Sequence, residues 1–344
     1  MITKHSSLGV IHIHTNFSDG SGDINAISLA AKKAGLDWII VSDHNDFSVE
    51  EGLYNGVIVI KGEEISPDIG YHTLAFDINE KISHSENPIE NIENVHKQGG
   101  FCFAAHPDES DSRKNSNKPI KWLDKKVVPD GIEVWNWFSD WANRFNSRDI
   151  FHIAYAFLFR KKLIRGIEPQ TRMWWDRINN EKADIFPAIA GSDAHALKVN
   201  NYLIPVTVFP YEYCFKTAAN LIFTDEPLFS DFETAKKQIL QAIKQGNNIL
   251  LNRKKCKRHN EVSLKVKNDS TSAFCGDKIN LDSNTVLRLN LPKKADVSLY
   301  LDGHEIKCEK TDKFFHNITE KGKYRIEVYK GKTPVLYTNP ILVV

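Results

Sequence analysis

The chain has 344 residues, of which 41% are hydrophobic and 26% are charged, a composition typical of a globular protein. This length is sufficient for one large domain and one smaller domain, each with its own core. The formal net charge is only +1, so the overall charge gives no reason to expect nucleic acid or an anionic membrane surface as a partner.

The five cysteines are scattered and include no CxxC pair, so neither a disulfide framework nor a thiolate zinc site is expected. Residues 1–14 lack the apolar core of a signal peptide, and no apolar segment is long enough to span a bilayer. We therefore expect a cytoplasmic protein with no membrane partner.

The first predicted strand carries His12 and His14. Residues two apart on a strand point to the same face, so both imidazoles can approach one ion. Asp19 follows in a turn, and Asp23 is a candidate N-cap for a helix that ends at Gly35. An HxH pair alone is more often incidental than metal-binding, but similar strand ends recur along the chain.

Six further apolar segments follow, and most of them end in His, Asp or Glu. They are residues 38–41 before His44, 57–60 before Glu64, 72–76 with His72, 101–105 before His106, 131–136, and 189–190 before Asp193 and His195. Helices are predicted at 88–98 and within 140–182. Alternating apolar strands and helices indicate a parallel sheet covered on both faces.

Seven such units favour a closed α/β barrel over an open sheet. In barrels the site is assembled from the carboxyl ends of many strands, whereas an open sheet binds its ligand at one switch point. We predict this barrel for residues 1–250, with a last helix at 233–245. Residues 258–344 contain five alternating segments (262–267, 285–291, 296–303, 324–331 and 340–344), which predict a small antiparallel β-sandwich-like domain. The basic run 253–259 is predicted to be a linker.

Nine side chains at the strand ends form a candidate metal site: His12, His14, Asp19, His44, Glu64, His72, His106, Asp193 and His195. Imidazoles and carboxylates suit zinc, manganese or iron, and a carboxylate can bridge two ions. Nine ligands are too many for one ion, so we expect two or three divalent ions.

The motifs HIHTNFSDG, SDHN, GEEIS, YH, AHPD and GSDAH occur in this order within residues 10–196. Together they resemble the PHP (polymerase and histidinol phosphatase) superfamily of metal-dependent phosphoesterases. The resemblance implies a distorted seven-stranded (βα) barrel with up to three ions. The segment IEVWN, the helical insert and the β-rich tail are similar to the branch related to carbaryl hydrolase, in which a β domain follows the barrel and ester or carbamate cleavage also occurs.

The resemblance also implies the ligands of each ion. The first ion would take His12, His14, Glu64 and Asp193, the second the bridging Glu64 with His72 and His106, and the third Asp19, His44 and His195. Glu64 is preferred over Glu63 because the family pattern places the glutamate two residues after a glycine, here Gly62. Glu63 should then point away from the site on a regular strand.

Adjacent ions lower the pKa of a shared water towards roughly 7, so the expected nucleophile is a metal-bound hydroxide. Asp43 is a candidate for orienting a ligand imidazole, with a turn or N-cap role as the alternative. Arg113, in the polar loop after His106, is a candidate for binding a phosphate, and Trp135 and Asn136 are candidates for contacting the substrate. A solvated loop is the alternative for Arg113 and core packing is the alternative for Trp135, and no general acid stands out.

The leading prediction is a metal-dependent phosphoesterase that hydrolyses a small phosphorylated metabolite or nucleotide. A hydrolase of carbamates or carboxylic esters at the same ions is the second hypothesis, and a non-catalytic binding protein is the third. We expect a small phosphoester or ester as the partner, and no nucleic acid beyond short oligonucleotides or nucleotides.

Overall fold

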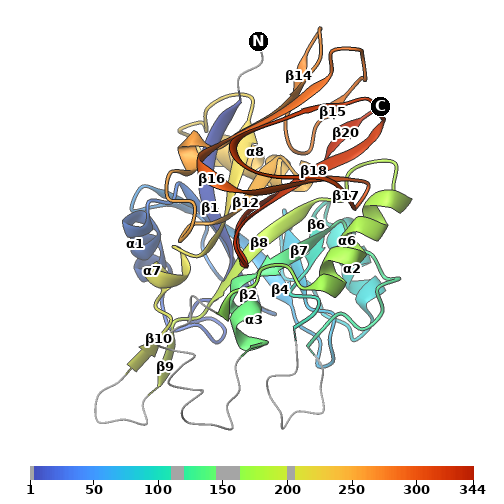
Figure 1. The fold of residues 1–344 in the computed structure, drawn as a ribbon. Helices are drawn as coiled ribbons and strands as arrows, with labels where there is room; N and C mark the ends of the chain where they lie inside the picture. The colour runs from blue at the N-terminus through green and yellow to red at the C-terminus, as the bar shows by residue number, and fades with distance from the viewer. Residues whose placement is uncertain (1–3, 110–119, 145–162, 200–205) are drawn as a thin grey trace.

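The structure is a computed structural model, and it describes residues 4–109, 120–144, 163–199 and 206–344 (Figure 1). The strands up to residue 252 are β1 (His5–Ile13), β2 (Trp38–His44), β3 (Gly52–Tyr54), β4 (Val57–Ile65), β5 (Thr73–Phe76), β6 (Phe101–Ala104), β7 (Gly131–Asn136), β8 (Ala188–Ala194), β9 (Leu197–Val199), β10 (Val206–Val208), β11 (Ala218–Thr224) and β12 (Asn248–Asn252). The helices are α1 (Ile24–Ala34), α2 (Pro88–Lys97), α3 (Trp137–Ala142), α6 (Pro169–Glu181), α7 (Tyr211–Cys214) and α8 (Phe232–Gln245).

Seven strands form a closed ring in the order β1, β2, β4, β5, β6, β7 and β8, and β8 pairs back to β1. The predicted seven-stranded barrel is thus confirmed. The prediction that all its strands are parallel was wrong, because β5 is antiparallel to both β4 and β6. A parallel return needs a crossover of about a dozen residues or more, and only residues 66–72 lie between β4 and β5.

Helices cover the barrel less evenly than a regular strand–helix alternation would. α1 follows β1, α2 follows β5, and α3 and α6 lie between β7 and β8. Between β2 and β4 the chain forms the short strand β3, and the described residues between β6 and β7 contain no helix. The (βα) repeat around the whole barrel therefore stays a prediction.

Helices α1 and α8 each begin after an aspartate N-cap and end at a glycine C-cap. Asp23 accepts a hydrogen bond from the backbone N of Ala26 at the start of α1, and Gly35 ends this helix with a φ of 69°. Asp231 caps α8 in the same way through Thr234. Side-chain oxygens at the N-cap satisfy otherwise unpaired N–H groups, and glycine adopts the left-handed C-cap conformation without steric cost.

The C-terminal strands continue the sheet of the barrel. The elements are η1 (His259–Glu261), β13 (Ser263–Lys267), β14 (Ser272–Ala273), β15 (Lys278–Ile279), β16 (Val286–Leu301), β17 (His304–Asn317), β18 (Gly322–Lys330), β19 (Thr333–Thr338) and β20 (Ile341–Val343). The first half of β1 pairs with β11, β11 with β12, and β12 with β19. The proposed division into 1–250 and 258–344 stays a prediction, and β12 and β19 pair across it.

The strands of this C-terminal part differ in detail from the prediction. The segments 285–291 and 296–303 are one strand, β16, with a register shift between Asn290 and Ala295 in place of a turn. β17 and β19 were not predicted, and β15 pairs with β20 in parallel. Most residues of β17 are exposed or half-buried, so its sequence lacks the alternation that marks a strand with one buried face.

A buried ionic network joins α6 to β18. Arg325 donates two hydrogen bonds to Asp176, at 3.0 and 2.9 Å, and also donates to Glu327. Arg172 lies 2.9 Å from the other carboxylate oxygen of Glu327. Because Arg325 is only 2% exposed, these contacts replace water around its charge. In the part of the chain that the structure describes, no helix is both long and apolar enough to cross a membrane.

Candidate metal centre

The predicted ligands come together at one end of the barrel. His12 and Asp193 lie within β1 and β8, and His14 and His195 follow these two strands. Glu64 lies near the end of β4. The remaining ligands are His44 at the end of β2, Asp19 after β1, His72 immediately before β5, and His106 after β6. His72 reaches the same end although it precedes its strand, because β5 runs in the opposite direction.

Glu64 is the centre of this cluster. Its carboxylate is fully buried and faces five imidazoles. Oε2 lies 3.2 Å from Nε2 of His12, 3.4 Å from Nε2 of His14 and 3.0 Å from Nδ1 of His44. Oε1 lies 2.8 Å from Nδ1 of His72 and 3.0 Å from Nε2 of His106. A carboxylate that divides its two oxygens between two sets of imidazoles has the geometry of a bridging ligand.

Two aspartates complete the cluster around His14. Oδ1 of Asp193 lies 3.2 Å from Nε2 of His14 and 3.5 Å from Nδ1 of His195. Oδ1 of Asp19 lies 3.2 Å from Nε2 of His195 and 3.7 Å from Nδ1 of His14. Candidate ligand atoms lie within 4.8 Å of one another in four groups: His14, Asp19, His44 and His195; His12, His106 and Asp193; His12, His14 and Glu64; and His44, Glu64 and His72.

The backbone is strained at three of these positions. His12, His106 and Asp193 have φ values of 66°, 25° and 51°, in a region that L-residues rarely adopt. The pairing of β1 with β8 also shifts register between Ile11 and Ile13, around His12. Such strain persists only where surrounding contacts hold it, and it is concentrated at functional sites.

Glu133, in the middle of β7, orients two of the ligands and was missed by the sequence analysis. Its Oε1 accepts from Nδ1 of His12 at 2.8 Å, and its Oε2 accepts from the backbone N of His106 at 2.7 Å. This leaves Nε2 of His12 to face Glu64. Gly191 makes room for the contact, since a Cβ there would lie 1.5 Å from Glu133 Oε1. A glutamate within the apolar strand GIEVWN was the signal available in the sequence.

Glu109 is a second carboxylate that the sequence analysis missed. Its Oε2 accepts from Oγ of Ser139 at 2.6 Å and lies 3.4 Å from Nδ1 of His106. Burial raises the pKa of Glu109, and the neighbouring imidazole of His106 opposes this effect. Glu109 follows His106 by three residues in a turn. It contacts Nδ1 of the imidazole, whereas Glu64 contacts Nε2 on the other side of the ring.

The protonation states of His14, Glu64 and Asp193 fit divalent cations. Burial, together with the imidazole of His195, lowers the pKa of His14 to about 3, so this ring is neutral, as a metal ligand must be. Neither of its buried ring nitrogens makes a well-formed hydrogen bond to the described residues. Burial opposes ionisation of Glu64 and Asp193, but the surrounding histidines hold the pKa of both carboxyls well below the ordinary range. Unpartnered buried imidazole nitrogens beside ionised carboxylates are the donor set that zinc, manganese and iron bind.

The cluster opens into a cavity of about 250 Å³, large enough for a small polar group and part of a substrate. The described residues that line it are Asp19, His44, His72, His106, Glu109, Ile120, Phe138, Asp193, His195 and Leu197. One side therefore consists of candidate ligands, and Ile120, Phe138 and Leu197 form an apolar side.

Asp43, Trp135 and Asn136 are not among the described residues that line this cavity. Asp43 accepts from the backbone N and Oγ1 of Thr15, at 2.7 and 2.8 Å, and from Ser18, so it holds the loop after β1 instead of an imidazole. Trp135 is 1% exposed, and its indole donates to Asp140. Although Trp135 lies on the barrel strand β7, its side chain faces the core, where it packs edge-on against Tyr337.

Asn136, the next residue, acts within the protein. Its Oδ1 caps α3 through the backbone N of Ser139, and its Nδ2 donates to Glu133 at 3.0 Å. Arg113 lies outside the described residues. Glu63 points away from the centre as predicted, and its Oε2 accepts from the backbone N of Ile82.

No protein-family model matches the chain. The chain is 31% identical over 148 residues to an uncharacterized protein of Methanocaldococcus jannaschii, a match that covers 37% of this chain and 80% of that protein. The chain belongs to the same family as this archaeal protein. The motifs also resemble the PHP superfamily, and the side chains that carry this resemblance form one cluster, part of which lines the cavity.

Two solved structures are similar to the chain at low identity. A two-domain protein of Bacteroides vulgatus, described as containing a predicted PHP-like metal-dependent phosphoesterase, gives a TM-score of 0.45 at 15% identity, over 98% of this chain and 95% of that protein. An amidohydrolase of Chromobacterium violaceum gives a TM-score of 0.33 at 14% identity, over 59% of this chain and 92% of that one. At TM-scores below 0.5 neither likeness bears on the function.

Loading the metal-free protein with zinc or manganese is expected to release protons at pH 7. Burial alone would lower the pKa of His106 and His195, but the carboxylates beside them raise both to about 9, so an ion must displace a proton from each. Affinity should then increase as the pH rises towards about 9. Calorimetric titration in two buffers of different ionisation enthalpy measures the released protons. Equal heats in both buffers would contradict the expectation.

Proposed function

We propose that the protein is a PHP-type metal-dependent phosphoesterase that hydrolyses a small phosphorylated metabolite or nucleotide with two or three divalent ions. The observation that carries this proposal is the position of Glu64, whose two carboxylate oxygens lie within 3.4 Å of five imidazoles. A single buried carboxylate shared by five imidazoles has no role in packing, but it is suited to bridging two cations.

Each ion would be bound by the set of residues that the resemblance implies. His12, His14, Glu64 and Asp193 would hold the first ion, Glu64, His72 and His106 the second, and Asp19, His44 and His195 the third. Divalent ions in such a site lower the pKa of water to roughly 7 and neutralise charge that develops on the substrate oxygen. Glu133 and Glu109 keep the imidazoles of His12 and His106 in place, and Ile120, Phe138 and Leu197 add apolar surface to the cavity.

A hydrolase of carboxylic esters or carbamates at the same ions is the second candidate. One observation favours it: among the described residues no lysine or arginine lines the cavity, whose remaining wall is apolar. A phosphate monoester carries up to two negative charges and is commonly bound by cationic side chains, whereas a neutral ester needs none. In the phosphoesterase hypothesis the ions must balance the part of this charge that no described cation faces.

Assays of the protein loaded separately with manganese, zinc and iron would test the proposal. We expect turnover of a phosphate monoester or diester such as p-nitrophenyl phosphate or bis-p-nitrophenyl phosphate, and loss of turnover after chelation. Turnover of aryl esters or carbamates without turnover of either phosphoester would favour the second candidate. Ion binding without any hydrolysis would favour the non-catalytic hypothesis. The cytoplasmic location and the small-molecule partner stay predictions.

A further inference from the structure

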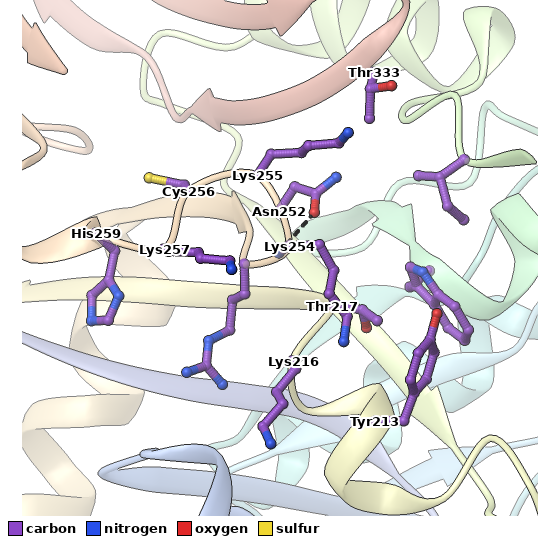
Figure 2. Close-up of a pocket in the computed structure, with 13 residues that line it drawn as sticks. Tyr213, Lys216, Thr217, Asn252, Lys254, Lys255, Cys256, Lys257, His259 and Thr333 are labelled. Carbon is purple, nitrogen blue, oxygen red and sulfur yellow. Dashed lines mark hydrogen bonds between the residues drawn. The ribbon is translucent and has the colours of Figure 1, made fainter. Parts of the chain in front are cut away.

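A larger cavity lies apart from the metal centre, where the loop after β12 meets the connection between α7 and β11. Its volume is about 540 Å³. Figure 2 shows that Lys254, Lys255 and Lys257, from the loop after β12, and Lys216, from the α7–β11 connection, surround it. The described residues that line it include no aspartate or glutamate. None of its described lining residues also lines the cavity at the metal centre.

A second cavity of about 440 Å³ lies on the other side of the same loop. Lys254, Lys255 and Lys257 line both cavities. The cationic residues that line one or both are Lys216, Arg253, Lys254, Lys255, Lys257, Arg258, Lys293, Lys294 and Lys330, and again no acidic residue is among the described lining. The whole chain carries a net charge of only +1, so this concentration of positive charge is local.

The loop that carries the lysines is fixed by its own hydrogen bonds. The backbone N atoms of Lys255 and Cys256 donate to the carbonyl of Asn252 at 2.9 and 2.8 Å. The guanidinium of Arg253 donates to the carbonyls of Phe215 and Ala34, which anchors the loop to the barrel. The basic run predicted to be a linker is thus an ordered turn, and a ligand would lose little free energy in ordering it.

Two acidic residues of the described chain form ion pairs with cations of this surface. Lys216 pairs with Glu212, and Arg258 lies 3.1 Å from Glu261. Lys255 and Lys257, which lie on the loop between the two cavities, are exposed. Several cations at the walls of a concave site repel one another, and an anion with several charges would relieve that repulsion.

The described lining is rich in cations and offers little aromatic surface for stacking a base. Trp137 is 3% exposed and is packed edge-on against Phe209 and Tyr213. Nζ of Lys254 lies 4.3 Å from the centre of the Tyr213 ring and covers one of its faces. Proteins that bind single-stranded nucleic acid combine a basic groove with exposed aromatic faces, so a ligand recognised by its phosphates alone fits better.

We propose that these two cavities form a binding site for an oligophosphate chain, that is, three or more linked phosphates, either as inorganic polyphosphate or as part of a nucleoside triphosphate. The first cavity has the volume of a small-molecule site. The ridge formed by Lys254, Lys255 and Lys257 lets one chain contact cations on both of its sides. This site is independent of the proposed hydrolytic activity.

Calorimetric titration of the full-length protein, kept metal-free with a chelator, would test the site without interference from the metal centre. The probes are inorganic tripolyphosphate, ATP and a single-stranded oligonucleotide. We expect tripolyphosphate and ATP to bind, and the affinity of both to fall as salt is raised. Equal affinities would mean that the phosphate chain alone is recognised, and tighter binding of ATP that the nucleoside adds contacts. Failure of both to bind at low salt would overturn the proposal.

The double variant Lys255→Glu/Lys257→Glu is expected to bind tripolyphosphate at least about tenfold more weakly, because two charge-assisted contacts become repulsive. The matched control is Lys310→Glu/Lys313→Glu, which reverses two exposed lysines on β17 that line neither cavity. The control should retain the affinity of the unmodified chain. An equal loss in both variants, or tighter binding of the oligonucleotide than of tripolyphosphate, would overturn the proposed site.

Discussion

Replacement of Glu64 by glutamine is expected to remove bound ions and to lower hydrolytic turnover by roughly a thousandfold, since metal-ion catalysis contributes several kcal/mol to transition-state stabilisation. Glutamine has nearly the same shape, so the change removes the charge that five imidazoles face. The measurements are the metal content of the dialysed protein and kcat for the substrate found in the assays proposed above.

The matched control is Glu63→Gln, one residue earlier on the same strand. The side chain of Glu63 accepts from the backbone N of Ile82 on the far side of β4, and the amide oxygen of glutamine can accept the same hydrogen bond. This variant should keep both its ions and its turnover. If Glu64→Gln kept them as well, the nine side chains would not form a metal centre.

The strand-end histidines could be predicted from the sequence because their signal is local. A short apolar segment followed by His, Asp or Glu occurs within a few residues, and the closure of a barrel brings such ends together whatever the details of the helices. The position of His72 is instructive. It was assigned to a strand end by pattern, yet it precedes β5 and reaches the centre only because this strand is antiparallel.

Residues that orient the ligands were harder to predict because their partners are distant in the sequence. Glu133 contacts His12 across 121 positions, and no spacing rule connects the two. Trp135, two residues later, illustrates the opposite error. Its place on a barrel strand suggested contact with the substrate, but burial against Tyr337 of β19 depends on the pairing of β12 with β19, which the sequence did not indicate.

Pairing between distant strands also explains why the two predicted segments form one strand, β16, and why the exposed strand β17 was not predicted. Pro292 and the two lysines that follow it resemble a turn. The strand nevertheless continues past them, because at a register shift not every residue needs a backbone hydrogen bond to the neighbouring strand. Tertiary pairing, which periodicity does not encode, therefore decided both the extent of the C-terminal sheet and its attachment to the barrel.

The attachment of the C-terminal strands to the barrel leads to a prediction for stability. Arg325→Ala is expected to lower the free energy of unfolding by about 3–5 kcal/mol, because it leaves the half-buried carboxylate of Asp176 and the buried carboxylate of Glu327 without their shared cation. The variant also loses the guanidinium contacts with the rings of Trp175 and Tyr300, at 4.9 and 4.2 Å. Urea unfolding of the metal-free protein measures the change.

Arg177→Ala is the control on the same helix, α6. Its ion pair with Glu181 is about half exposed, so its removal should change stability by no more than about 1 kcal/mol. The comparison tests whether β18 is held to α6 by buried charge. A loss for Arg325→Ala no larger than for Arg177→Ala would mean that the sheet continuity from β1 through β11, β12 and β19 is sufficient to hold the C-terminal strands. A large loss in a single cooperative transition would mean that the barrel and these strands unfold together.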